Sequence, residues 1–178
     1  DRRDAHGKLW LGYPRPSSRA GLDLALDLKP KFAKGGGFYA FNEDSFKVAK
    51  TDTPWVFSSG ARGLLRADLP LLGKDQQPDT YTVRLYFSAL EGDQPGQRVF
   101  DVKLGDKTVT AGLDLTAAAG GAMRSLVREF RSVPVSGSLS VELISKQADP
   151  TEAQMPLLSG IEVLRTNARE ITEQVAAR

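Results

Sequence analysis

The sequence has 178 residues, 40% hydrophobic and 26% charged, the usual composition of one soluble globular domain with a core. Its 24 basic and 22 acidic residues give a net charge of +2, which argues against binding nucleic acid by phosphate neutralisation, and no apolar run approaches the roughly 18 residues of a membrane span. Cysteine is absent and His6 is the only histidine, so thiol catalysis, disulfides and a histidine-based zinc site are excluded.

The first forty residues open with "DRRDAHGKLW" and no methionine, from which we expect a mature or excised piece of a longer protein. His6 lies in a loop-like stretch and is predicted to be a solvated terminal residue. Residues 22–28, "LDLALDL", alternate leucine with other residues and predict a strand. The glycines at 35–37 precede the strand-like run "FYAF" rather than a helix, so we expect a flexible turn and no phosphate cradle.

The middle of the chain has the period of two that is typical of strands. In residues 81–90, "YTVRLYFSAL", alternation places Tyr86 on the face opposite the apolar residues. Residues 96–109, "GQRVFDVKLGDKTV", predict a hairpin that turns at Gly105-Asp106, with Phe100, Val102 and Leu104 on one face of its first strand. The second strand continues through "KTVTAGLDL".

Further strands are predicted at 126–135 and 138–145, paired across Ser136-Gly137, and at 156–165. Many short alternating strands separated by Gly/Pro turns favour an all-β antiparallel sandwich or barrel over residues 1–165. Residues 167–178 differ, because Ile171 and Val175 are four apart among good helix formers. Residues 166–178 are therefore predicted to be a helical tail, either frayed or linking to the rest of a larger protein.

Signatures of catalysis and of metal binding are weak. The sequence has no G-x-S-x-G elbow, Walker loop or dinucleotide fingerprint, and no D-x-D-x-D-G calcium loop. Carboxylates such as Glu91 and Asp149 would suit a glycosidase pair, but scattered surface carboxylates are the ordinary case. We therefore predict a protein that is not an enzyme and has no cofactor and no metal site.

Two aromatic residues and one polar loop are the candidate ligand contacts. Tyr39 follows Phe38 with the opposite orientation, and Trp55 lies beside Pro54 ahead of the loop "SSGARG". A flat ring on a wet face can stack on a sugar, although packing in the core is the commoner role of such rings. In the loop "EGDQPGQR", residues 91–98, Glu91, Asp93, Gln97 and Arg98 are candidates to line a groove, and a plain solvated hairpin loop is the alternative.

The order of these segments resembles the malectin and malectin-like domains. The resemblance rests on "YTVRLYFSALEGDQPGQRVFDVKLGDKTVTAGLDLTAAAGG", then "VREFRSVPVSGSLSVELIS", then "PLLSGIEVL", over roughly residues 80–164. Family members show a strand entering "FAE", then "G-x-R-x-F-D-V", a hairpin, "AGG", a strand pair and a terminal "P-x-(I/L)-(S/N)-G-I-E-(V/I)". Residues 8–63 resemble the front part of versions appended to large bacterial extracytoplasmic proteins.

The resemblance implies a galactose-binding-like jelly roll that binds carbohydrate, glucose-containing oligosaccharides in particular, with aromatic side chains on loops at one edge. It also implies an acidic ligand contact before the last strand, which matches Asp149 in "KQADPTEAQMP". Glu91 and Gly92 stand where a malectin carries adjacent aromatics, so Tyr39 and Trp55 are the remaining candidates for stacking. We therefore predict a non-catalytic carbohydrate-binding module of a larger extracytoplasmic protein, whose partners are carbohydrate or neighbouring domains. The alternative is a structural or protein–protein interaction module.

Overall fold

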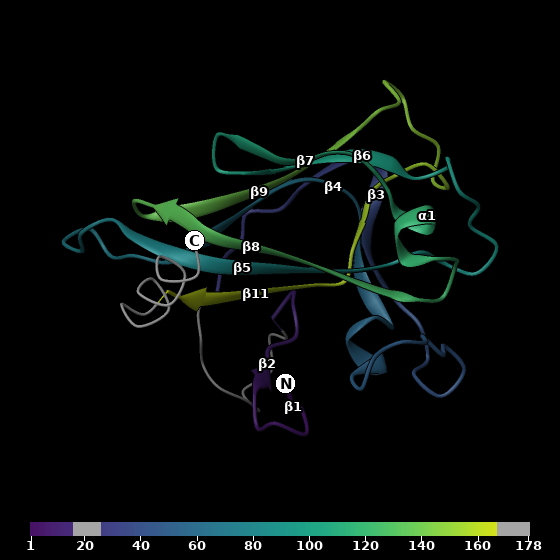
Figure 1. Cartoon of the computed structure of the whole chain (residues 1–178), viewed down its shortest axis with the longest axis horizontal. Helices are drawn as coiled ribbons and strands as arrows, with labels where there is room; N and C mark the ends of the chain where they lie inside the picture. The colour runs from purple at the N-terminus through teal and green to yellow at the C-terminus, as the bar shows by residue number, and fades with distance from the viewer. Residues whose placement is uncertain (16–25, 167–178) are drawn as a thin grey trace, which may run out of the picture.

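Two antiparallel sheets face each other across the hydrophobic core in the computed structural model of the chain (Figure 1). The structure describes residues 1–15 and 26–166. The predicted all-β antiparallel sandwich is confirmed. The predicted boundary of the domain at residue 165 stays a prediction, and the helix expected at 167–178 lies outside the described residues.

The larger sheet has six strands in the order β10-β4-β9-β6-β7, with β3 beside β4. Its strands are β3 (Lys31–Ala40), β4 (Ser59–Pro70), β6 (Val99–Leu104), β7 (Lys107–Asp114), β9 (Ser138–Ser145) and β10 (Leu157–Leu158). The smaller sheet has the order β11-β5-β8, from strands β5 (Asp79–Ser88), β8 (Ser125–Val135) and β11 (Gly160–Arg165). A separate two-stranded pair joins β1 (Arg2–Arg3) to β2 (Leu9–Trp10).

Alternation along the strands explains which side chains fill the space between the sheets. On β6, Phe100, Val102 and Leu104 are buried, as predicted, and the hairpin to β7 turns at Gly105-Asp106. On β5, the alternate apolar residues face the core and Tyr86 lies on the outer face, against Trp10. The apolar side chains on the inner face of each strand pack against those of the facing sheet, and this packing holds the two layers together.

One predicted pairing and one predicted strand are wrong, because neighbouring segments belong to different sheets. Residues 126–135 and 138–145 do not form a hairpin: β8 pairs with β5, whereas β9 pairs with β4 and β6. The turn at Ser136-Gly137 therefore carries the chain from one layer to the other. The strand expected at 156–165 is divided at Ser159, because β10 pairs with β4 and β11 pairs with β5.

The first part of the chain also differs from expectation. The glycines at 35–37 are not a turn but lie inside β3, where the register with β4 shifts between Phe32 and Gly37 and Gly35 has φ of 81°. A glycine takes that conformation without strain, so the strand bulges rather than ends. Of the strand expected at 22–28, residues 26–28 are not in a strand and 22–25 lie outside the described residues. The stretch 59–63 of the expected loop "SSGARG" belongs to β4.

A short helix, α1 (Leu115–Ala119), begins at the last residue of the strand that the sequence suggested over 107–115. The Asp114 carboxylate accepts a hydrogen bond from the Ala117 N–H, and Gly120 ends the helix in the left-handed conformation, with φ of 77°. Aspartate before a helix and glycine after it are the usual caps. These two signals could have revealed the helix, and they explain "LDLTAAAGG" as a capped turn.

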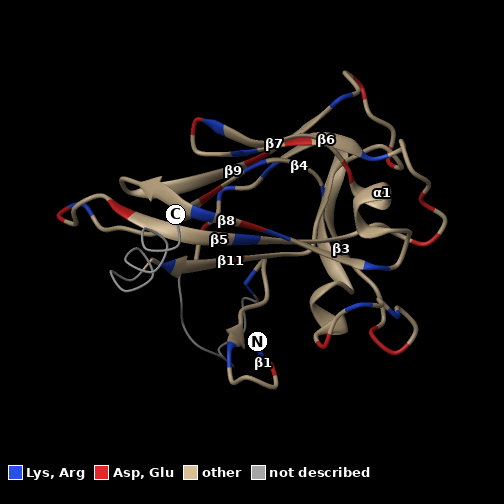
Figure 2. Cartoon of the chain, viewed as in Figure 1, with Lys and Arg blue, Asp and Glu red and all other residues tan. Residues whose placement is uncertain are grey.

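Basic and acidic residues are interspersed over the described part of the molecule rather than separated by sign (Figure 2). The outer face of the larger sheet illustrates this, because Arg66 there pairs with both Asp68 and Glu142. Within residues 1–15 and 26–166, no helix has the length and apolar character needed to cross a bilayer.

Candidate functional site at the loop rim

The end of the sandwich that carries α1 is formed by loops from both sheets (Figure 1). The loop of residues 89–98 joins β5 to β6, and the loop of residues 146–156 joins β9 to β10. We call this end the loop rim. Four of the predicted contact residues lie on the first loop and Asp149 lies on the second, so the fold brings together segments about fifty residues apart in the sequence.

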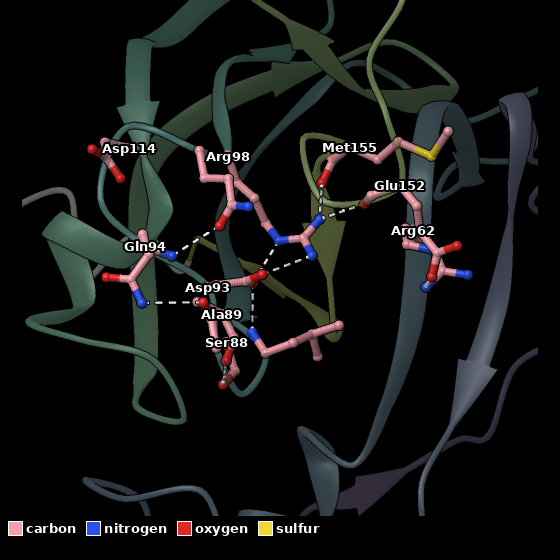
Figure 3. A network of polar contacts seen from close by, with 12 residues as sticks. Arg62, Ser88, Ala89, Asp93, Gln94, Arg98, Asp114, Glu152 and Met155 are labelled. Carbon is pink, nitrogen blue, oxygen red and sulfur yellow. Dashed lines mark hydrogen bonds and ion pairs between the residues drawn. The ribbon is translucent and has the colours of Figure 1, made fainter.

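A buried ion pair is the centre of the loop rim (Figure 3). The Arg98 guanidinium donates from Nε to Asp93 Oδ2 over 2.6 Å and from Nη2 to Asp93 Oδ1 over 3.0 Å. The two side chains are only 3% and 7% exposed. The planar fork of an arginine matches a carboxylate in this two-pronged manner, which fixes direction as well as distance.

The same guanidinium also connects the two loops. Arg98 Nη1 donates to the carbonyl of Glu152 over 2.9 Å and to that of Met155 over 2.8 Å, both in the second loop. The Glu152 carboxylate in turn accepts a hydrogen bond from Arg62 on β4. Arg98 therefore positions the second loop against the first, and its buried side chain does not reach solvent at the rim.

Further hydrogen bonds shape the first loop. The Asp93 carboxylate accepts from the Leu90 N–H over 2.8 Å, and the Asp114 carboxylate at the start of α1 accepts from the Gly96 N–H over 2.6 Å. The Gln97 Oε1 accepts from the Gln94 N–H over 2.9 Å. Each of these bonds satisfies a backbone donor that the loop would otherwise leave unpaired. The loop is consequently held at three points before any ligand arrives.

The predicted residues at the loop rim differ in exposure. Glu91 and Asp149 are exposed, Gln97 is half-buried, and Arg98 is buried. Glu91 and Asp149 thus present carboxylates to solvent from two loops that Arg98 ties together. Asp93, which was expected to line a groove, is instead buried against Arg98. Arg62 and Glu152 are supporting residues that the prediction left out, because a loop sequence does not show which of its charges is buried.

Tyr39 faces the space between the sheets and is packed against the core, while Phe38, its neighbour on β3, is exposed. Burial raises the pKa of the Tyr39 hydroxyl, and this effect outweighs the nearby Ser159 hydroxyl and the Arg98 guanidinium, which lower it. The ring therefore lies beneath the loop rim, near the buried pair, and is not on its surface.

Trp55 lies apart from the loop rim, in the single 3-10 turn η1 (Pro54–Val56). It belongs to a smaller hydrophobic cluster and meets Trp10 edge to face, with 6.1 Å between ring centroids. The Arg2 guanidinium lies 4.7 Å from the centre of the Trp55 ring. His6, as predicted, is exposed; its Nε2 is 3.6 Å from the Asp52 carboxylate.

Comparisons with known structures agree on the fold. A Bacteroides uniformis beta-glucuronidase is 13% identical with a TM-score of 0.59 over 78% of this chain, and the chain covers 14% of that enzyme. The extracellular domain of ANXUR1 from Arabidopsis thaliana is 13% identical with a TM-score of 0.63 over 79% of this chain, which covers 41% of that domain. At such identity the likeness concerns the fold alone. No curated protein matches the sequence.

The family comparison is more specific. The model of the malectin domain matches residues 38–161, which is more than half of the chain and includes both loops of the rim, α1, Tyr39 and Trp55. The resemblance to malectin domains that the sequence suggested is thus confirmed. The chain belongs to the malectin domain family.

Proposed function

We propose that this chain is a non-catalytic carbohydrate-binding module that takes oligosaccharides, glucose-containing ones among them, as part of a larger extracytoplasmic protein. The malectin domain is a carbohydrate-binding module and not a catalytic family. Structurally similar domains form part of a longer glycosidase chain and of a receptor's extracellular domain, of which this chain spans 14% and 41%. These relationships support the class of function and the placement outside the cytoplasm.

The observation that carries the proposal is the buried Asp93–Arg98 pair and its bonds to the second loop. It holds Glu91, Gln97 and Asp149 in fixed relative positions, so little conformational entropy is lost when a ligand binds. Carboxylates that face solvent accept strong hydrogen bonds from neighbouring sugar hydroxyls. Arg98 acts here as a positioning residue, since its N–H groups are used within the protein.

The two aromatic candidates pack against the protein and do not form an exposed surface at the loop rim. Tyr39 packs under the loop rim, and Arg2 lies over the ring of Trp55. Removing either ring would therefore disturb packing as well as any stacking on a sugar. We propose that the polar groups of the loop rim recognise the sugar, so substitutions of those groups are the informative variants.

The test is isothermal titration of a panel of gluco-oligosaccharides and other glycans against the folded protein and two variants, Glu91→Gln and Asp149→Asn. Each variant removes one charge-assisted hydrogen bond, so we expect affinity to fall about 10- to 100-fold. Asp106→Asn is the matched control, because Asp106 is exposed in the β6–β7 turn at the opposite end of the sandwich. No heat with any glycan, or an equal loss in the control, would overturn the proposal.

A protein-interaction module is the second candidate function, and one observation favours it. Phe38 and Phe41 are each 42% exposed, while Glu91 and Gly92 provide no stacking ring on the first loop. Large exposed rings are enriched at protein interfaces. A stable partner that co-purifies with the domain, is not displaced by free sugars and is lost in Phe38→Ser would support this function. Sugar-sensitive binding would support the first.

A further inference from the structure

A groove lies between the N-terminal segment and the outer face of the smaller sheet. Its volume is about 260 Å³, just below the range of about 300–1,000 Å³ that is usual for ligand pockets. It is lined by the N-terminal residues Asp4, His6, Lys8 and Trp10, by residues 50–53, and by Tyr86, Ser125 and Val127 from β5 and β8.

The N-terminal wall of this groove is fixed by its own contacts. Asp4 accepts hydrogen bonds from the His6 and Lys8 N–H groups, both over 3.0 Å, and from the Trp10 indole over 3.2 Å. Lys8 Nζ lies 2.7 Å from the carboxylate of Glu162, which is 7% exposed. The Trp10 ring meets Tyr86 edge to face, with 5.0 Å between centroids. These contacts hold the wall in place without a ligand.

The opposite wall is formed by residues 50–53, which precede η1. Ser125 on β8 donates from its hydroxyl to the Lys50 carbonyl over 2.6 Å, and its N–H donates to the Ala49 carbonyl over 3.0 Å. The Thr53 N–H donates to the Thr51 hydroxyl over 3.0 Å. Both walls are thus joined to the same sheet, and the groove is part of the folded structure.

The groove depends on a segment outside the family match. Asp4, His6, Lys8 and Trp10 come from the first ten residues, whereas the malectin domain match begins at residue 38. The groove is therefore formed partly by residues outside the malectin domain match, and its lining residues are not those of the loop rim.

The chemistry of the lining indicates a neutral ligand with many hydroxyls. Two acidic residues, Asp4 and Asp52, are balanced by two lysines, Lys8 and Lys50, so there is no charge excess to select a phosphate or an ammonium group. The Lys50 ammonium has no ion pair among the described residues, and Asp52 faces only the exposed His6. A donor and an acceptor are thus available beside Val127, which is 43% exposed. Trp10 lies next to them, with Lys8 Nζ 5.7 Å from the centre of its ring.

We infer that this groove is a second saccharide site, which takes one or two sugar residues at the end of a neutral glycan. Asp52 and Lys50 bond the hydroxyls, while Val127 contacts the apolar C–H face of the sugar beside Trp10. The ligand class rests on the proposed carbohydrate-binding function, but the residues involved are separate from those of the loop rim.

The test uses NMR titration of the whole 178-residue chain with short neutral saccharides such as maltose and cellobiose, following the indole N–H signal of Trp10. Trp55→Phe assigns that signal, because the chain has two tryptophans. We expect Trp10 and residues 50–53 to shift in the native protein and in Asp149→Asn. The shifts should be at least tenfold weaker in Asp52→Ala and absent in Val127→Arg, which fills the groove.

The possible results separate the two proposals. Saccharide shifts confined to residues 91–98 and 147–156 would overturn the groove and leave the loop rim intact. Shifts confined to Trp10 and residues 50–53 would support the groove and overturn the loop rim. No shifts with any saccharide would overturn the groove proposal, and the glycan titration above then decides whether carbohydrate binding fails as well. Val127→Thr, which keeps the shape of the side chain, is expected to retain binding and controls for misfolding.

Discussion

A single arginine determines how the loop rim is built. Arg98 makes two hydrogen bonds to Asp93 and two to carbonyls of the second loop, with its side chain 3% exposed. Taking two charges out of water is costly, and only complete pairing offsets the cost. The residue is therefore more sensitive to substitution than the exposed residues around it.

Replacing Arg98 with methionine is expected to lower the free energy of unfolding by about 3–5 kcal/mol, because it leaves the Asp93 carboxylate buried without its partner. The double variant Asp93→Asn/Arg98→Met should recover part of this loss, since no buried charge remains. Urea denaturation measures both. Arg131→Met is the control, because Arg131 pairs with Glu129 while 60% exposed and should change stability by at most about 1 kcal/mol. A loss below that value in Arg98→Met would contradict the interpretation.

Substituting alanine for two glycines in neighbouring strands should change the stability of the fold differently at the two positions. A Cβ on Gly60 would lie 2.6 Å from the Leu158 carbonyl and 2.8 Å from the Tyr39 hydroxyl, whereas one on Gly37 would meet no atom within 4 Å. We expect Gly60→Ala to destabilise the fold by about 1–3 kcal/mol through overpacking. Gly37→Ala should be neutral or stabilise by up to about 1 kcal/mol, because the unfolded chain loses freedom. Thermal unfolding of the pair measures the difference, and equal effects would refute it.

Among the elements, the N-terminal pair β1–β2 contacts the sandwich through Trp10, which meets Tyr86, and the turn before β2 does so through Lys8, which pairs with Glu162 on β11. Burial raises the pKa of Glu162, but hydrogen bonds from Lys8 and Tyr86, with the Lys8 and Arg84 charges, outweigh this effect and hold it below the ordinary 4.5. The ionised form therefore stabilises the folded state. Its contribution is full above about pH 4.5 and is lost as the pH falls through the lowered pKa.

Glu162→Gln is accordingly expected to lower the free energy of unfolding by about 1–3 kcal/mol at pH 7. The difference from the native protein should shrink as the pH falls below 4.5, the ordinary pKa of glutamate. Urea denaturation over a series of pH values measures it. The control is Glu43→Gln, which breaks the Arg2–Glu43 contact to the same N-terminal segment at a site more than half exposed. A difference independent of pH would rule out the ion pair as the cause.

The stability of the whole molecule depends on the packing of side chains between the two sheets. Phe87 from the smaller sheet and Phe100 from the larger one are both 0% exposed, and their rings are 6.0 Å apart between centroids. Alanine at either position removes a large buried side chain from a close-packed interior, which leaves a cavity.

Phe87→Ala and Phe100→Ala should therefore each lower the free energy of unfolding by about 3–5 kcal/mol. Phe38→Ala is the control, because Phe38 is 42% exposed and should cost only about 1 kcal/mol. Chemical denaturation followed by circular dichroism gives all three values. Similar losses at the three positions would show that the layers are not held by this contact.

Much of the candidate site could be anticipated, but not its construction. The loop rim contains Glu91, Gln97, Arg98 and Asp149 as the sequence indicated, yet only three-dimensional packing shows that Arg98 is buried and that Asp93 is its partner. Tyr39 and Trp55 were predicted as stacking rings with core packing as the alternative, and both pack against protein. The groove could not be foreseen, because its walls are more than forty residues apart in the chain.

The sequence by itself determined the all-β class, the faces of β5 and β6 and the turn at Gly105-Asp106, because alternation and turn chemistry are local properties. The tertiary structure alone decided that β8 and β9 separate into different sheets, that β10 and β11 divide at Ser159, and that Arg98 points inward. The physical reason is that a strand's pattern shows which side is apolar but not which strand will pair with its edges. That choice depends on the free energy of packing the whole core.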